Sequence, residues 1–312
     1  MLEQANYAVY VGYPKGYISE YNHTHSVLKN DQGDVITHFG GDNATQGQLG
    51  SGVQNSPAMV MEVPSKMEVM WFSVTENQFW RGEFDLPKEK IAHALKDEKI
   101  LDLFTTRAGN RVTKYDQIVV NVAPKGKVYV YLNGIPTQLL ATYQAQPIQY
   151  EWSQHVHETW AIQGQEVISQ AEFRIAMKKD YGTIVNEIDQ NYKEDFFTAV
   201  RWRLNIQGEK KILAYAVRTL NGEYTQLFEN TAQQEIKSIP SEIVADVEDQ
   251  GQVKRYRIQL NNSYDFYKKH FKNTSLVNVF IDLPDADHGF LYFQQDDQKI
   301  EFDDFSISEL VR

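Results

Sequence analysis

The chain has 312 residues, of which 42% are hydrophobic and 12% aromatic, so it can bury one large core or two of ordinary size. Its formal net charge of -11 repels a phosphate backbone, which excludes nucleic acid as the expected partner and favours a basic protein. The absence of cysteine excludes disulfides, thiolate catalysis and thiolate metal sites. No stretch approaches the ~18 apolar residues of a membrane span, and we expect no signal peptide at the start.

The first expected elements in chain order are a hairpin and a long polar loop. The hairpin, SVLKNDQGDVITHF over residues 26–39, turns near Gly33. The loop over residues 40–57, GGDNATQGQLGSGVQNSP, has no apolar periodicity, and loops of this length are often functional or disordered. Its uncharged groups suit hydrogen bonding to a protein surface, the alternative being a connection without a role. The partner-binding residues predicted in this loop are Asp42, Asn43, Gln46, Gln48, Ser51 and Gln54.

A pattern of two strands and a helix occurs twice in the chain. EVPSKMEVMWF…FWRGEFDLPKEKIAHAL resembles SIPSEIVADVE…KRYRIQLNNSYDFYKKHF, with Pro64 and Pro240 separated by 176 positions, as are Leu95 and Phe271. The first helix is expected to start at Pro87, whose missing N–H costs nothing in a first turn. A second hairpin is expected at Asn221-Gly222, a dipeptide that suits a type I′ turn. The repeat predicts two similar halves.

The stretch EWSQHVHETW, residues 151–160, raises the possibility of a metal site. Read as an amphipathic strand, it places His155 and His157 together on its polar face, and HTH places His23 and His25 on one face as well. A strand can offer two imidazoles to zinc in this way, but zinc needs further ligands, and none occurs at a telling spacing. We expect ordinary solvent-facing residues here, with a metal-dependent enzyme as the alternative. No catalytic residue and no cofactor are predicted.

Two further segments complete the chain. Residues 164–196 are expected to form helices that join the halves. Carboxylates gather near the end of the chain, without the spacing of an EF-hand loop. They are expected either as solvated hairpin tips or as a docking surface for a basic partner. The partner-binding residues predicted in this cluster are Asp296, Asp297, Asp303 and Asp304.

The predicted fold class is α+β and mostly β, in keeping with the many aromatic residues. We expect two similar antiparallel β-rich lobes, each with one helix. The predicted domains are residues 1–145 for the first lobe, 146–195 for a helical linker and 196–312 for the second lobe.

The first half resembles a known family of bacterial proteins. MEVMWFSVTENQFWRGEFDLPKEKI, YDQIVVNVAPKGKVYVYLNG and the early YPKGY are similar to segments of the family catalogued as domain of unknown function 2931. The resemblance covers residues 7–145 well and residues 195–305 more loosely. The shared motifs are turns, aromatic core positions and a helix start, so they imply a fold and carry over no catalytic residue.

The resemblance also implies a function and a location. Family members are commonly lipoproteins of Gram-negative bacteria, and some lie beside secreted antibacterial effectors, notably type VI secretion lipases. This implies an immunity protein of the periplasm, with an adjacent gene encoding its partner and an outer-membrane lipid anchor in the native form. An envelope lipoprotein with a structural or binding role is the alternative. The lipobox cysteine is missing from this sequence.

Overall fold

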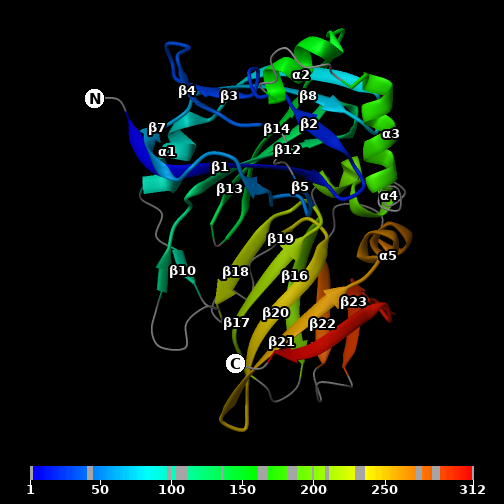
Figure 1. Cartoon of the computed structure of the whole chain (residues 1–312). Coiled ribbons are helices and arrows are strands. Elements are labelled where there is room, and N and C mark those ends of the chain that lie inside the picture. The colour runs from blue at the N-terminus through cyan, green and yellow to red at the C-terminus, as the bar shows by residue number, and fades with distance from the viewer. Residues whose placement is uncertain are drawn as a thin grey trace. The chain divides into compact units, whose positions relative to one another are not determined.

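The computed structural model (Figure 1) divides into two compact units, each with its own core. The first unit comprises Met1–Asp102 and Asn110–Lys193, and the second comprises Leu103–Gly109 and Glu194–Arg312. The segment that the sequence predicts as a linker therefore lies largely within the first unit. The structure describes residues 3–40, 45–96, 100–102, 111–134, 136–160, 168–181, 188–198, 200–207, 211–228, 236–271, 276–282 and 289–310.

The fold is mostly β with several antiparallel sheets, which confirms the predicted fold class. The first sheet of the first unit is built around strand β1, whose apolar residues are buried. β1 pairs in parallel with β12, and the long crossover between them makes this pairing possible. The strands, in sheet order, are β14 (Gln138–Gln144), β13 (Lys127–Asn133), β12 (Gln117–Ala123), β1 (Gln4–Pro14) and β5 (Thr45–Gly47), with β6 (Val53–Gln54) and β7 (Met59–Glu62) also paired to β1.

The second sheet of the first unit contains the predicted hairpin of residues 26–39. Its turn is held by the Asn30 side chain, which accepts hydrogen bonds from the backbone N–H groups of Gln32 and Asp34, and Gly33 adopts a φ of 88°. The hairpin prediction is therefore confirmed. The strands, in sheet order, are β15 (Gln146–Ile148), β9 (Gln78–Asp85), β8 (Lys66–Ser73), β3 (Val27–Lys29) and β4 (Val35–His38), with β2 (Ser19–Tyr21) paired to β8.

The helices of the first unit bury apolar faces. α1 (Lys88–Lys96) follows Pro87 and buries Ile91, Ala94 and Leu95, as its predicted stripe requires. α3 (Gln170–Asp180) starts with a capping box, in which Ser169 and Glu172 satisfy each other's backbone N–H groups. Further elements are α2 (Trp152–Trp160), α4 (Ile188–Asn191), the turn η1 (Pro124–Gly126) and a separate two-stranded sheet of β10 (Ile100–Asp102) and β11 (Arg111–Thr113).

The second unit has two five-stranded sheets and the helix α5 (Ser263–His270). The predicted hairpin at Asn221-Gly222 is present, but its turn is not type I′, since only Gly222 of this dipeptide has a positive φ. Thr219 and Glu223 instead close a three-residue loop with Gly222 in the left-handed region. The strands of one sheet, in sheet order, are β19 (Ile236–Lys237), β16 (Arg201–Gln207), β22 (Val277–Asp282), β23 (Phe290–Gln295) and β24 (Gln298–Glu301). Those of the other are β18 (Tyr224–Phe228), β17 (Lys211–Thr219), β20 (Pro240–Asp249), β21 (Gln252–Leu260) and β25 (Phe305–Leu310). The short 3₁₀ helix η3 (Glu194–Phe197) precedes these strands in the chain.

The two units share an order of strand pairing. The path β4-β3-β8-β9 in the first unit corresponds to β18-β17-β20-β21 in the second, and β1-β12-β13-β14 corresponds to β16-β22-β23-β24. In both units the first strand pairs in parallel with a strand that comes after the helix in the chain, β12 after α1 and β22 after α5. This correspondence supports the internal repeat predicted from the sequence. Across the described ranges, no helix has the length and apolar character that a membrane span requires.

Candidate functional site

The histidine pair of residues 151–160 lies on a helix and not on the predicted strand. Residues Trp152–Trp160 form α2, on which His155 is buried and His157 is exposed. Residues two positions apart point to different sides of a helix, so the two imidazoles do not share a face. The prediction of a strand was wrong because Trp152, Val156 and Trp160 are spaced by four, which fits alternation as well as a helical turn.

His155 is a buried packing residue. The Asn22 amide nitrogen lies 3.2 Å from its Nδ1, and because an amide NH₂ can only donate, Nδ1 accepts and Nε2 carries the hydrogen. Nε2 lies 3.7 Å from Glu20 Oε2, and neither atom has a hydrogen-bond partner among the described residues. The ring packs against Phe79 and Trp152. His155 therefore presents no lone pair to a metal ion.

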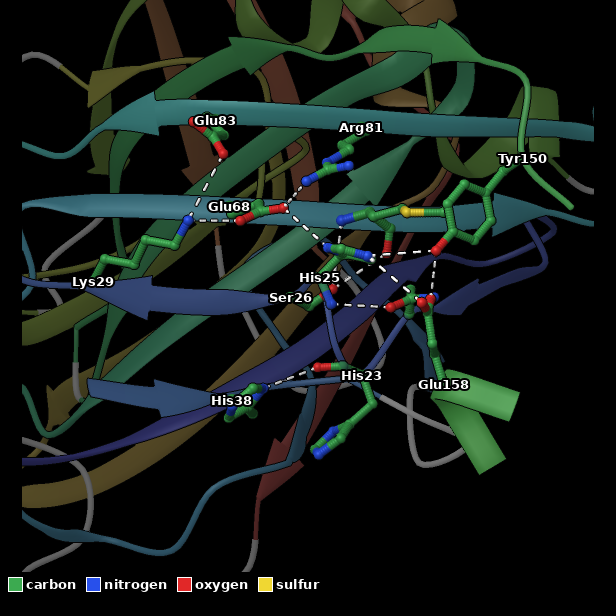
Figure 2. A network of polar contacts seen from close by, with 12 residues as sticks. His23, His25, Ser26, Lys29, His38, Glu68, Arg81, Glu83, Tyr150 and Glu158 are labelled. Carbon is green, nitrogen blue, oxygen red and sulfur yellow. Dashed lines mark hydrogen bonds and ion pairs between the residues drawn. The ribbon is translucent and has the colours of Figure 1, made fainter. Parts of the chain in front are cut away.

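The other two histidines of the predicted set face different surroundings. His25 Nδ1 lies 3.3 Å from Glu68 Oε1, and His25 Nε2 lies 3.8 Å from Glu158 Oε1. His23 is exposed and stacks on His38 (Figure 2). The structure thus does not assemble His23, His25, His155 and His157 into one site. Among the residues it describes, no group of three or more histidine or acidic side chains has the arrangement of a metal centre.

A polar network of the first unit surrounds Glu68 on β8 (Figure 2). Lys29 Nζ donates a hydrogen bond of 2.6 Å to this buried carboxylate, and Arg81 donates another. Burial by itself would raise the pKa of Glu68, but the hydrogen bonds from Lys29 and Arg81 outweigh it and hold the pKa below its usual value. Glu68 is therefore a charged structural anchor that joins β3, β8 and β9.

A second carboxylate extends the network to α2. Glu158 accepts hydrogen bonds from Tyr150 at 2.7 Å, from Asn22 at 2.9 Å and from Gln154 at 3.0 Å. Burial would raise the pKa of Glu158, but these hydrogen bonds together with His25 lower it. Burial, followed by the hydrogen bond to Glu158, raises the pKa of the Tyr150 hydroxyl. The network therefore fastens α2 to the sheet.

One face of the second sheet changes character along its length. Met70, Phe72 and Phe79 form its apolar end and belong to the cluster that contains Phe173 of α3. At the other end, Glu68 and Lys66 of β8 lie opposite Glu83 and Asp85 of β9. Charged side chains line a hollow of about 360 Å³ at this end, and both signs of charge are represented. The hollow is lined by Lys29, Gly33, Lys66, Met67, Glu68, Glu83, Phe84 and Asp85.

The predicted polar loop is partly built into the first sheet. β5 and β6 lie within it and pair with β1, so part of the expected loop forms short strands. Asn121 of β12 holds its middle, since its side chain accepts from the Gly50 N–H and donates to the Ser51 carbonyl. Gly52 is required for this docking, because a Cβ at that position would lie 2.6 Å from the Val11 carbonyl oxygen.

The structure describes only some of the contact residues predicted in this loop, and they differ in exposure. Gln48 and Gln54 are exposed, and Ser51 is half-buried with its hydroxyl donating to the Gln48 carbonyl. Asp42 and Asn43 lie outside the described residues, and so does the side chain of Gln46, whose backbone belongs to β5. The Ser51 hydroxyl is therefore hydrogen-bonded within the loop itself.

Sequence reasoning missed three exposed apolar residues beside this loop. Val53 on β6 and Met59 and Val60 on β7 expose 39%, 51% and 64% of their surface. Together with Gln48, Ser51 and Gln54 they form what we call the edge segment, residues 48–60. For Met59 and Val60 the signal lay in the sequence AMVMEV, whose consecutive apolar residues exceed what one buried strand face can hold.

The predicted acidic residues lie in the second unit. Asp296 and Asp297 form the exposed turn between β23 and β24, and Asp296 has a φ of 51°. Asp303 and Asp304 are exposed beside a hollow of about 390 Å³ near α5, and Asp304 accepts a hydrogen bond from Asn262. The first pair is thus a hairpin tip, whereas the second pair lines a recess.

Comparison with known proteins identifies the family. A family model described as protein of unknown function (DUF2931) matches residues 3–198, which is more than half of the chain. The match runs through α2 and α3, which the resemblance seen in the sequence does not cover. No curated protein and no solved structure matches the chain. The chain belongs to the DUF2931 family of proteins of unknown function.

Proposed function

We propose that this chain is an immunity protein that binds a secreted antibacterial effector and neutralises it by covering its functional surface. The observation that carries this proposal is the edge segment. Val53 of β6 and Met59 and Val60 of β7 lie exposed where these strands pair with one edge of β1, and Gln48 and Gln54 are exposed in the same segment. Exposed apolar residues among uncharged polar ones are typical of a protein-binding surface.

The backbone of the edge segment adds to this argument. Among the described residues, β7 pairs with β1 alone, so β7 is an edge strand of the first sheet. An exposed apolar edge invites pairing with another chain, and binding domains use such edges to capture an extended segment. The contacts of Asn121 and Gly52 hold the segment in place before binding, which reduces the entropy lost in the complex.

The polar networks of the first unit favour binding over catalysis. Glu68 and Glu158 are each engaged by several donors from the same unit and serve to hold α2 and the sheet together. The Ser51 hydroxyl donates to a backbone carbonyl, and a carbonyl oxygen cannot act as the general base that would activate a nucleophilic serine. We therefore propose a role that depends on surface contact and not on a chemical step.

Charge and family resemblance support a basic partner and a periplasmic location. The net charge of -11 steers a basic surface towards the chain, and Asp296, Asp297, Asp303 and Asp304 are exposed to receive it. The family resemblance implies an effector encoded by an adjacent gene, for example a type VI secretion lipase. We propose that the protein acts in the periplasm, with an outer-membrane lipid anchor in its native form.

The test is co-expression of the chain with the product of its adjacent gene. A stable complex on size-exclusion chromatography, together with suppressed toxicity of that product, is the expected result. Val60→Lys should weaken the complex by roughly 30-fold, which corresponds to a hot-spot loss of about 2 kcal/mol. Ile175→Lys is the matched control, since Ile175 is 69% exposed on α3 and lies outside the edge segment.

Three outcomes would contradict the proposal at different levels. Equal affinities for the Val60→Lys variant and the wild type would remove the edge segment as the binding surface. A harmless neighbour that does not associate with the chain would remove the immunity role, and an envelope-binding role would then be the better description. Charge reversal at Asp296 and Asp297 that left affinity unchanged would exclude that hairpin tip from the interface.

A further inference from the structure

A buried histidine and a buried glutamate of the first unit face each other without a hydrogen bond. His155 of α2 and Glu20 of β2 expose 0% and 6% of their surface. His155 Nε2 lies 3.7 Å from Glu20 Oε2, and within the part of the chain that the structure describes neither atom has a hydrogen-bond partner. The other oxygen of Glu20 accepts from the Trp160 indole N–H. Buried polar atoms are nearly always paired, so this unsatisfied contact calls for an explanation.

The Asn22 side chain fixes the state of the other nitrogen of the His155 ring. Asn22 Oδ1 accepts from the His25 backbone N–H at 2.9 Å, and Asn22 Nδ2 donates to a carboxylate oxygen of Glu158 at 2.9 Å. A turned amide would lose both contacts, because an NH₂ group cannot accept and an ionised carboxylate cannot donate. The amide nitrogen therefore faces His155 Nδ1, 3.2 Å away, and this contact holds only while Nδ1 keeps its lone pair.

A second proton on the imidazole reverses the balance between these two contacts. It adds an N–H at Nδ1 that points at the Asn22 NH₂ group, and two donors that face each other repel. It also gives the ring a positive charge beside the Glu20 carboxylate, in a buried site where an ion pair is stronger than in water. Protonated His155 is therefore attracted to Glu20 and repelled by Asn22.

The surroundings of the ring act on this charge in opposite directions. Strands β8 and β9 present the uncharged rings of Phe72 and Phe79, and burial among them disfavours a positive charge. Carboxylates from β2 and α2 favour it. The titratable groups around the site are Glu20, with Tyr13 of β1 beside it, and Glu158, with His25 and Tyr150 beside it.

We propose that His155 is an acid-sensitive switch that pairs with Glu20 and releases Asn22 when its ring takes up a proton. Imidazole is the side chain whose ordinary titration falls between about pH 5 and 8. Release of Asn22 breaks its contacts to Glu158 and to the His25 N–H, so the junction between α2 and the turn after β2 opens. This change occurs at a higher pH than the protonation of Glu158, whose pKa is lowered by its hydrogen-bond donors.

The test is hydrogen–deuterium exchange of the full chain at about pH 7.5 and about pH 5.5, with labelling times scaled for the pH dependence of intrinsic amide exchange. The amides of residues 19–26 and 152–160 should exchange roughly tenfold faster at the lower pH, because the lost Asn22 contacts include one to a charged group. Helix α1 of the same unit should show no such increase. NMR of the chain with isotope-labelled histidine should show that His155 gains a proton over the same interval.

Three variants separate the switch from general acid sensitivity. His155→Gln removes the proton site and keeps hydrogen-bonding groups, so the increase in exchange should disappear. His157→Gln is the matched control, because His157 is exposed on the same helix and its replacement should leave the increase unchanged. Glu20→Gln removes the partner carboxylate, so the increase should shift to a lower pH, and this variant decides where His155→Gln does not fold.

Three results would overturn the proposal. The first is an increase in exchange for His155→Gln that equals that of the wild type. The second is a Glu20→Gln variant whose increase occurs at the same pH as in the wild type. The third is an NMR signal of His155 that does not change between about pH 7.5 and about pH 5.5.

Discussion

Asn22 joins three parts of the first unit, and its truncation to alanine measures what that junction contributes to stability. Its fully buried side chain donates to Glu158 and to His155 Nδ1, and accepts from the His25 N–H. A hydrogen bond contributes about 1 kcal/mol between neutral groups and about 1.5–3 kcal/mol to a charged group. Glu158 keeps Tyr150 and Gln154 as donors, so we expect Asn22→Ala to lower the free energy of unfolding by about 2–4 kcal/mol.

Urea denaturation followed by tryptophan fluorescence gives the required measurement. Four of the five tryptophans, Trp71, Trp80, Trp152 and Trp160, lie in the first unit, so the signal reports chiefly on that unit. The midpoint should fall with little change in the slope of the transition. Asn6→Ala is the control, because Asn6 is an exposed residue of β1 and its loss should cost little. A loss below about 1 kcal/mol for Asn22→Ala would refute the reasoning that the buried junction is stabilising.

Two further predictions concern the loss of stability in acid and the close backbone packing at Gly52. The pKa values of Glu68 and Glu158 lie below the usual 4.5 in the folded protein. The two ionised carboxylates therefore stabilise the folded state above about pH 4.5, and this contribution is lost as the pH falls through the lowered pKa values. The urea midpoint should therefore drop between about pH 7 and about pH 3, and Glu158→Gln should reduce this drop; an equal drop in the variant would contradict the assignment. Gly52→Ala should lower thermal stability by about 1–3 kcal/mol, because its Cβ would meet the Val11 carbonyl oxygen at 2.6 Å. An unchanged melting temperature would show that β6 can shift away from β1 without cost.

Elements with local signals were predictable from the sequence, and long-range pairings were not. Pro87 and the apolar stripe that follows it located α1, and the polar turn at Gly33 located the β3–β4 hairpin. The parallel pairing of β1 with β12 has no such signal, because it depends on residues 109 positions apart, such as Ala8 and Gln117. The turn at Gly222 was located correctly but given the wrong type, since its backbone angles depend on the loop length that the strands select.

The candidate sites were harder to predict for a different reason. Trp152, Val156 and Trp160 are spaced by four residues, and this spacing satisfies both the period of two and the period of 3.6. The tertiary structure decides for a helix, because α2 can then place His155 over Phe79 and Glu158 beside Tyr150. The pairing of His23 with His38 depends on where a turn meets a hairpin, which the order of residues alone does not reveal.

The parallel pairing of β1 has a consequence for how the first unit is made. Hairpins such as β3–β4 and β8–β9 join neighbouring residues and can close early, whereas β1 must wait until residue 117 has been synthesised. During that interval its core residues Tyr7, Val9 and Val11 have no central neighbour to cover them. β5, β6 and β7 can cover one edge of β1 earlier, but its other edge stays open until β12 is complete. A nascent chain paused before that point would present an apolar strand with an open edge to chaperones and to other nascent chains.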